Sequence, residues 1–121
     1  MANERQKSEK AGRSAELMAL WSLRLKGWRL LAQRYRSHSG EVDLIMRRGE
    51  VTAFIEVKAR RRLDDAIYSV TPRQARRIAA AARQFMAEDR RAALQACRFD
   101  IVAVTPYHWP RHIENAFEGG E

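Results

Sequence analysis

The stretch of sequence that decides the fold reads EVDLIM (residues 41–46), RRGE (residues 47–50) and VTAFIEVK (residues 51–58). The first and third segments are rich in Val, Ile and other apolar residues, which is typical of β-strands. The segment between them is short and polar, and its Gly49 supplies the positive φ that a tight hairpin turn requires. These residues therefore predict two antiparallel strands joined by a turn.

The predicted hairpin places four charged side chains together. Strand residues two apart share a face, so Glu41 and Asp43 lie on one face of the first strand. Glu56 and Lys58 lie on the matching face of the second strand. The opposite face, which includes Val42, is purely apolar in both strands and is expected to meet the core.

This arrangement has two interpretations. Carboxylates and a lysine placed among Val, Leu and Ile are costly to remove from water unless they pair or bind an ion. One interpretation is an ion pair of Lys58 with Glu56 or Asp43 on an otherwise solvated strand face. The other is a cation site for phosphodiester cleavage, in which a hard cation with oxygen ligands neutralises charge and lowers the pKa of an attacking water. A nearby lysine would orient or deprotonate that water.

Glu16 adds a carboxylate from a predicted helix over residues 8–26. Apolar side chains recur along this segment at helical spacing: Leu17, Leu20, Trp21 and Leu25. Glu16 lies on or beside this apolar stripe, because residues three and four apart on a helix are neighbours. It is either a boundary residue or a group aimed into the site.

Further elements are predicted on either side of the hairpin. We expect a strand over residues 28–35, a polar basic loop over 59–69, a helix that begins at Thr71, a strand over 98–104 and a short element over 113–117. Thr71, Pro72 and Gln74 are typical of an N-cap, a first-turn proline and a capping box. The order α-β-β-β-α-β predicts an α/β fold with a central mixed sheet flanked by helices.

The composition favours an anionic partner. The chain has 23 Lys and Arg against 15 Asp and Glu, a formal net charge of +8, and 19 of the basic residues are Arg. The planar guanidinium group matches phosphate oxygens bidentately, so nucleic acid is the first candidate partner. A base-composition bias of the genome would produce the same excess of Arg without any function.

Other features of the composition exclude several classes of protein. Cys97 is the only cysteine, so an internal disulfide is excluded. The first residues lack the apolar segment of a secretory signal, and no apolar run approaches the roughly 20 residues of a membrane span. We expect a cytoplasmic protein with no membrane partner, formed by one domain over residues 1–121 with residues 1–7 as a flexible tail.

Asp43, followed on the next predicted strand by Glu56-Val-Lys58, resembles the PD-(D/E)xK signature of restriction-endonuclease-like nucleases. More closely, the chain resembles the YraN-like family of small bacterial proteins, which are predicted endonucleases. The segments that carry this resemblance are Gly12 with Ala15-Glu16, Gly27-Trp28, GEVDLI (40–45), FIEVKAR (54–60), VTPR (70–73), RFD (98–100) and AF (116–117).

The resemblance implies a restriction-endonuclease-like fold, a divalent metal (Mg²⁺ or Mn²⁺) and a nucleic-acid substrate, with structured or branched DNA favoured. Asp43 and Glu56 would be metal ligands, with Glu41 as a further candidate ligand. Lys58 would be the catalytic lysine. Glu16 would complete the catalytic set, by analogy with the Holliday-junction resolvases of this fold. The chain departs from the signature in having Val rather than Pro before Asp43.

Five residues are candidates for contacts with nucleic acid. Arg60, Arg61 and Arg62 directly follow the strand with Glu56-Val-Lys58, and this position favours phosphate contacts over a plain solvated run. Arg73 and Gln74 stand at the start of the later helix. Lys is expected in place of Gln74 in many relatives, which weakens a phosphate contact from this helix, and the capping box is the preferred explanation of Gln74.

Several histidines and tryptophans invite other interpretations. Pro110 breaks any helix that would align His108 with His112, so the histidines are expected at the surface or in turns and are assigned no metal. Trp21 is expected in the apolar stripe of the first helix. Trp109 lies in a predicted loop and stays open for base stacking.

Three functions are compatible with these features. The first is a metal-dependent endonuclease, and the second is a nucleic-acid-binding module that retains the nuclease fold but cleaves nothing. The third is a protein whose basic face meets an acidic protein partner. A homodimer stays open for all three.

Overall fold

The predicted hairpin forms the centre of a five-stranded mixed sheet. The structure, a computed structural model, describes residues 4–119, with side chains from residue 12 onward. Its elements, in chain order, are α1 (Glu4–Arg24), β1 (Arg29–Arg36), β2 (Glu41–Arg48), β3 (Val51–Ala59), α2 (Leu63–Ile67), α3 (Pro72–Glu88), α4 (Arg90–Leu94), β4 (Ala96–Val104) and β5 (Arg111–Ile113).

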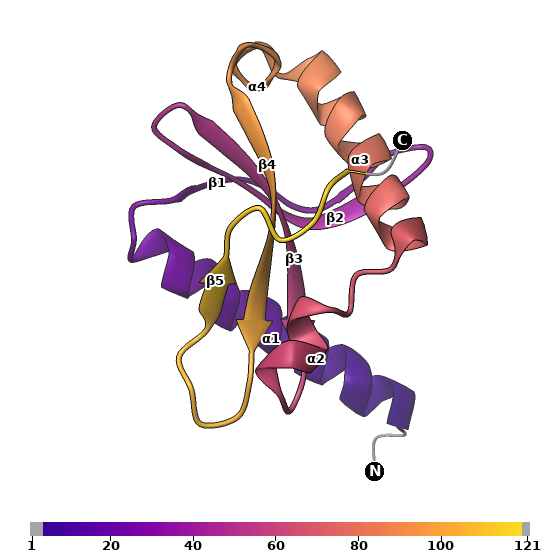
Figure 1. Ribbon diagram of the computed structural model, residues 1–121, viewed down its shortest axis with the longest axis vertical. Coiled ribbons are helices and arrows are strands. Elements are labelled where there is room, and N and C mark those ends of the chain that lie inside the picture. The colour runs from indigo at the N-terminus through magenta and orange to yellow at the C-terminus, as the bar shows by residue number, and fades with distance from the viewer. Residues whose placement is uncertain (1–3, 120–121) are drawn as a thin grey trace.

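The strands lie in the order β1-β2-β3-β4-β5 (Figure 1). Neighbouring strands are antiparallel except β3 and β4, which are parallel. The hairpin ladder of β2 and β3 runs from Leu44–Ile55 to Arg48–Val51, and Gly49 has a φ of 60° in the turn. A parallel pair needs a crossover connection, which α2, α3 and α4 supply.

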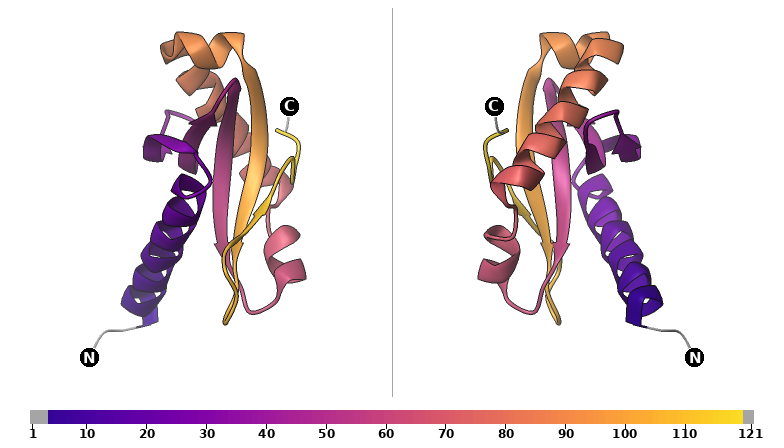
Figure 2. Two further views of the ribbon diagram at one scale, coloured as in Figure 1. Left: turned by 90° about the vertical axis from the view of Figure 1, so that its left-hand side faces the viewer. Right: turned by 90° about the vertical axis from the view of Figure 1, so that its right-hand side faces the viewer.

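Helices cover both faces of this sheet. Figure 2 shows α1 on one face and α2 and α3 on the other. On the α1 side, the buried side chains of β2 and β3 are Leu44, Met46, Ala53 and Ile55. On the α3 side they are Val42, Ile45 and Phe54. The α/β fold class is therefore confirmed, and the layers are consistent with a restriction-endonuclease-like core.

The termini and connections differ from the predictions in four places. The predicted loop 59–69 contains the short helix α2, whose first turn carries Asp64 and Asp65, which complement the helix dipole. The short helix α4 was not predicted, and the terminal element is β5, earlier than expected. The predicted tail lies partly outside the described residues, and α1 already begins at Glu4.

The prediction that Leu17, Leu20, Trp21 and Leu25 form the buried stripe of α1 is wrong except at Leu20. Leu17, Trp21 and Leu25 are 51%, 57% and 74% exposed. From residue 12 onward, the buried positions of α1 are Ala15, Ala19, Leu20, Ser22 and Leu23. The edge of the helix that carries Ala19, Leu20 and Leu23 packs against the sheet, so Leu17 and Trp21 on the neighbouring edge stay exposed. No helix within residues 4–119 has the length and apolar character that crossing a membrane requires.

Gly40, in the connection between β1 and β2, allows a close approach of α3. A Cβ atom at Gly40 would lie 1.8 Å from the backbone carbonyl oxygen of Arg77 in α3. That oxygen cannot rotate away, so Gly40→Ala must displace α3. We expect a loss of about 1–3 kcal/mol or more in the free energy of unfolding, measured by chemical denaturation.

Gly12→Ala is the matched control, because nothing lies within 4 Å of a Cβ atom at this position of α1. We expect it to raise the free energy of unfolding by about 0.5–1 kcal/mol. A Gly40→Ala protein as stable as the wild type would show that α3 has no such close contact.

Candidate active site

Asp43 and Glu56 meet where β2 and β3 separate. The backbone ladder ends at the Leu44–Ile55 pair, and beyond it side chains replace the ladder. The Val57 N–H donates to Asp43 Oδ2 at 2.8 Å, and the Asp43 N–H donates to Glu56 Oε1 at 3.2 Å. Each carboxylate is thus anchored to the backbone of the opposite strand, and the pattern of alternating side chains predicted their convergence.

The predicted alternation is wrong at Val42. Val42 packs with Ile45 and Phe54 on the α3 side, whereas Leu44 packs on the α1 side. The strand pairing is irregular at this point: the β2–β3 register ends at Leu44–Ile55, and on the other side of β2 Arg34 has a φ of 50° between the paired residues Gln33 and Tyr35. Residues of α1 lie over the face with the carboxylates, so this face is not the solvated strand face of the first interpretation.

Lys58 lies beside this pair without a close partner. Its side chain is 10% exposed, and its Nζ lies 3.9 Å from Glu56 Oε2. Among the side chains that the structure describes, Lys58 makes no shorter polar contact. The ion pair of the first interpretation is therefore present but long, and within the described side chains no other anion lies closer to the ammonium group.

Glu16 and Glu41 approach the pair from two directions, each held by an arginine of β1. Glu16 of α1 accepts a hydrogen bond from Arg34 Nε at 2.9 Å. Glu41 Oε2 lies 3.5 Å from Arg36 Nε, with both side chains exposed. Glu16 is therefore positioned in the site by Arg34, and Glu41 lies at its rim.

These residues line one cleft between α1 and the hairpin, here called the carboxylate cleft. It consists of two hollows of 360 and 490 Å³ that share Gly12, Glu16 and Asp43. The smaller hollow is also lined by Arg13, Arg34, Arg36, Glu41 and Val42. The larger is also lined by Ala15, Glu56, Val57, Lys58, Ala59 and Arg60. Asp43 thus stands at the junction, with basic side chains at both ends.

The electrostatics of the cleft favour protonated carboxyls or a bound cation. Burial, and then the neighbouring charge of Asp43, raises the pKa of Glu56 to about 8. Burial, together with the charges of Glu16 and Glu41, raises the pKa of Asp43 to about 6, against the lowering effect of the Val57 N–H. Lys58 opposes both increases without cancelling them. Carboxyls perturbed in this way by burial and like charge are frequent at functional sites.

The donor atoms suit a cation held by few protein ligands. In the described part of the chain, no group of three His, Cys, Asp or Glu side chains is placed to hold a metal ion. Asp43 and Glu56 nevertheless each use only one oxygen in the hydrogen bonds between β2 and β3. Mg²⁺ commonly binds through one or two carboxylates and keeps several waters. The pair suits this mode of binding, and Glu41 lies at the rim of the same cleft.

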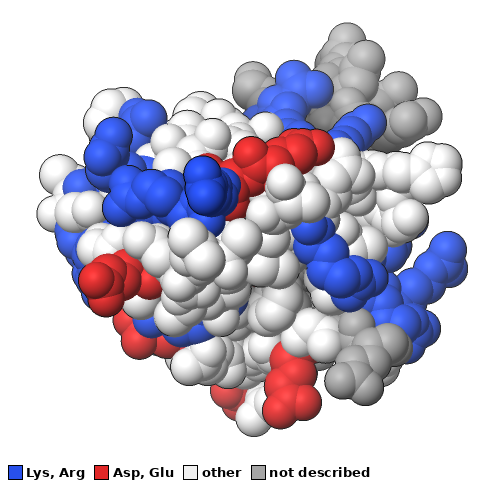
Figure 3. Space-filling model, turned by 90° about the horizontal axis from the view of Figure 1, so that it is seen from above, with Lys and Arg blue, Asp and Glu red and all other residues white. Residues whose placement is uncertain are grey.

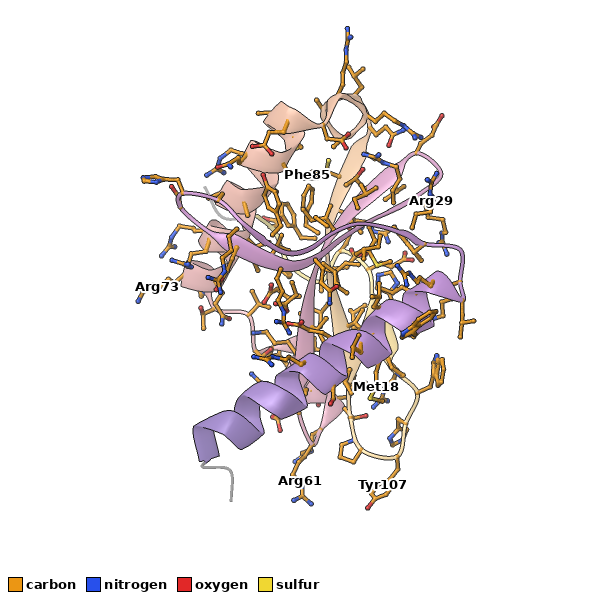
Figure 4. All side chains as sticks on the ribbon, turned by 180° about the vertical axis from the view of Figure 1, so that it is seen from behind. Met18, Arg29, Arg61, Arg73, Phe85 and Tyr107 are labelled. Carbon is orange, nitrogen blue, oxygen red and sulfur yellow. The ribbon has the colours of Figure 1, made fainter. Side chains whose placement is uncertain are left out.

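The basic candidates separate into two groups. Arg60 lines the carboxylate cleft, and Arg61 and Arg62 follow it as exposed residues. Arg73 lies in a different place, as the labels of Arg61 and Arg73 in Figure 4 show. The Gln74 side chain accepts from the Thr71 N–H at 3.1 Å in the predicted capping box.

Arg34 and Arg36 are residues of the cleft that sequence reasoning missed. They lie two apart on β1, so both face the same side, and that spacing was the only signal in the sequence. Positive charge is not confined to the cleft, however. Figure 3 shows Lys and Arg groups interspersed with Asp and Glu at the end of the molecule that carries α4.

The prediction for His112 is wrong. Its Nε2 lies 2.7 Å from Asp100 Oδ2, and its side chain is buried in β5. Arg98 and the Asn115 N–H also contact Asp100. Burial raises the pKa of Asp100, but the hydrogen bonds from His112 and Arg98 bring it below its usual value. This network joins β4 to the C-terminal segment and lies outside the carboxylate cleft.

Comparison with known proteins identifies relatives of the whole chain. The model of the uncharacterised protein family UPF0102 matches residues 15–104. A UPF0102 protein of Mesorhizobium japonicum is 46% identical over 115 residues, which cover 95% of this chain and 92% of the relative. A UPF0102 protein of Rhizobium meliloti is 47% identical over 111 residues, covering 92% and 91%. A third, of Methylocella silvestris, is 45% identical over 117 residues, covering 97% and 94%. The resemblance to the YraN-like family is thus confirmed, and the family description carries no activity.

Proposed function

The chain belongs to the uncharacterised protein family UPF0102, and from this premise we propose that it is a metal-dependent endonuclease that hydrolyses phosphodiester bonds in nucleic acid, with DNA favoured. One observation carries the proposal. Two half-buried carboxyls with raised pKa values, Asp43 and Glu56, are anchored side by side. Next to them lies a buried lysine, Lys58, whose shortest polar contact among the side chains of residues 12–119 is 3.9 Å. A structural ion pair would not need a second carboxylate in the same cleft.

Each side chain has a role in this proposal. Asp43 and Glu56 would hold Mg²⁺ or Mn²⁺, which when bound neutralises phosphate charge and lowers the pKa of a bound water. Lys58, which lines the same hollow, orients the attacking water and offsets the negative charge of the phosphate. Arg60 binds a phosphate at the rim.

Glu16 and Arg34 act as a second layer of the site. Arg34 holds Glu16 at 2.9 Å, and both line the hollow that ends at Asp43. We assign Arg34 and Arg36 to phosphate contacts on the β1 side. When Arg34 turns to a phosphate, the Glu16 carboxylate becomes free to accept a proton or a hydrogen bond from the attacking water.

The experiment that tests the proposal is a cleavage assay with a panel of structured DNAs and RNAs in Mg²⁺, Mn²⁺ or EDTA. We expect cleavage that requires the metal. Calorimetric titration of Mg²⁺ or Mn²⁺ should show binding by the wild type. If no metal binds, even with nucleic acid present, Asp43, Glu56 and Lys58 form a buried ion-pair cluster instead.

Lys58→Met separates catalysis from binding. Met keeps the buried aliphatic stem of Lys58 and removes the ammonium group. We expect cleavage to fall by about 10²- to 10⁴-fold, the usual range for a positioned proton-transfer group. Metal affinity in calorimetry and nucleic-acid affinity in a filter-binding assay should change little. Cleavage at the wild-type rate would remove Lys58 from the mechanism.

A nucleic-acid-binding module without cleavage is the second candidate. It is favoured by the engagement of Glu16 with Arg34, which leaves the described carboxylate cleft without a third carboxylate ligand. This candidate predicts affinity for nucleic acid that falls linearly with the logarithm of salt concentration, and no cleavage in any metal. Binding to an acidic protein would lack that dependence on the number of phosphates.

A further inference from the structure

Beside the two hollows of the carboxylate cleft lies a further hollow, at the carboxyl ends of β3 and β4. It has a volume of 680 Å³ and is here called the aromatic groove. Its lining residues are Met18 of α1, Ala59 to Arg61, and Val104 to Trp109. The two parallel strands end together, because Ala59 is in register with Val104 and the Arg60 N–H donates to the Val104 carbonyl at 3.1 Å. Ligands of α/β sheets commonly bind outside the carboxyl ends of parallel strands.

The aromatic groove is continuous with the carboxylate cleft. Ala59 and Arg60 line both, and Lys58 immediately precedes them. Figure 4 shows Arg61 and Tyr107 projecting from the same end of the molecule, with Met18 on the helix that crosses the sheet above them. A polynucleotide strand that leaves Lys58 therefore reaches Arg60 and Arg61 next and then the loop that carries Tyr107.

This loop displays aromatic side chains to solvent at a cost. Tyr107 is fully exposed and has a φ of 63°, a conformation that non-glycine residues adopt rarely. Trp109 is 62% exposed. His108 Nδ1 lies 2.9 Å from the Pro106 carbonyl, which holds the loop. Two exposed aromatic rings beside two arginines bury little surface in the fold, so their position points to a ligand.

We propose that the aromatic groove binds unpaired bases, so that the substrate of this protein is a nucleic acid with a single-stranded segment next to the cleaved phosphate. The inference rests on the proposed function. Bases stacked inside a duplex cannot reach Tyr107 or Trp109, whereas bases of a single strand stack on aromatic rings regardless of sequence. Arg60 and Arg61 bind the phosphates that connect those bases to the carboxylate cleft.

The charge of the groove favours nucleic acid over a second protein chain. Met18 and Trp109 also line a neighbouring apolar hollow with Leu17, Trp21 and Pro110. A protein partner that covers Tyr107 as well would have to desolvate or neutralise Arg60 and Arg61, which costs free energy unless acids are supplied. A single strand supplies one phosphate per nucleotide along the same path. One ligand then contacts both the aromatic rings and the two arginines.

The test compares the affinities for a blunt hairpin duplex and the same duplex with a single-stranded thymidine arm. Both are fluorescently labelled and measured by anisotropy in EDTA, so that no cleavage occurs. The wild type should bind the armed duplex more tightly. Trp109→Ala and Tyr107→Ala should each weaken binding to the armed duplex by roughly 5- to 150-fold and leave the blunt duplex unchanged. Trp109→Phe should retain most of the affinity for the arm.

Tyr68→Ala is the matched control, because Tyr68 is 82% exposed and does not line the groove. It should change neither affinity. Equal losses for both duplexes, or losses no larger than those of Tyr68→Ala, would overturn the inference. So would light scattering that shows the alanine variants dissociating a dimer while affinity for the arm persists.

The two proposals fail in different ways. If the wild type prefers the armed duplex but never cleaves in Mg²⁺ or Mn²⁺, the proposed endonuclease function is contradicted and the binding of unpaired bases in the aromatic groove is supported. If the wild type cleaves blunt and armed duplexes equally and binds them with equal affinity, the endonuclease function is supported and the role of the aromatic groove is contradicted.

Discussion

Asp43→Asn is expected to abolish metal binding and cleavage while the fold and the affinity for nucleic acid persist. Asn keeps an oxygen that accepts from the Val57 N–H, which Asp43 accepts at 2.8 Å. What disappears is the negative charge that a divalent cation requires. Cleavage should fall by roughly a hundredfold or more. Mutating a residue that only hydrogen-bonds to a metal ligand already lowers metal affinity or activity by about 10- to 100-fold.

The measurements are cleavage rate, metal titration by calorimetry, and affinity for labelled DNA. Asp65→Asn is the matched control, since Asp65 is an exposed aspartate in the first turn of α2. It should leave the cleavage rate unchanged. If Asp43→Asn binds the metal with wild-type affinity, the cation lies elsewhere.

Glu56→Gln is expected to make the metal-free protein more stable at high pH. Burial raises the pKa of Glu56 in the folded protein to about 8, above its value of about 4.3 in the unfolded chain. The folded state therefore binds more protons than the unfolded state between these values, and stability falls as pH rises through them. Gln removes this loss and can still accept the hydrogen bond from the Asp43 N–H.

The difference between variant and wild type should be small below about pH 4 and should grow to the order of 2 kcal/mol above pH 8. Urea denaturation in EDTA across this range measures it. Glu50→Gln, in the exposed hairpin turn, is the control and should change the free energy of unfolding by less than about 0.5 kcal/mol. Adding Mg²⁺ should stabilise the wild type more than Glu56→Gln, because only a ligand that binds the folded state raises its stability.

A stability difference between Glu56→Gln and the wild type that shrinks as pH rises in EDTA would contradict this account of Glu56. A gain for Glu56→Gln that is independent of pH would point to packing rather than charge. Together with the loss of cleavage, a pH-dependent gain would indicate that the protein sacrifices stability to keep the pair in its cleft, as functional sites often do.

Local patterns in the sequence were sufficient for the parts of the fold that depend on near neighbours. The hairpin follows from alternating strand residues around Gly49, and the helix start follows from Thr71 and Gln74, which bond to each other three residues apart. Even the meeting of Asp43 with Glu56 follows from the register of one hairpin.

Contacts between distant segments were not predictable in the same way. The pairing of Glu16 with Arg34 joins α1 to β1, and the burial of His112 against Asp100 joins β5 to β4. The exposure of Trp21 depends on how much of the sheet α1 covers. The parallel pairing that places Tyr107 beside Arg61 depends on the crossover.

The sequence by itself thus determined the hairpin, its pair of carboxylates with Lys58, and the family to which the chain belongs. Only the tertiary structure decided that Arg34 restrains Glu16, that Trp21 is exposed while His112 is buried, and that an aromatic groove continues the cleft. The physical reason is range. Turn conformation, capping and strand alternation are set by residues a few positions apart, whereas burial and charge pairing depend on which surfaces the folded chain brings together.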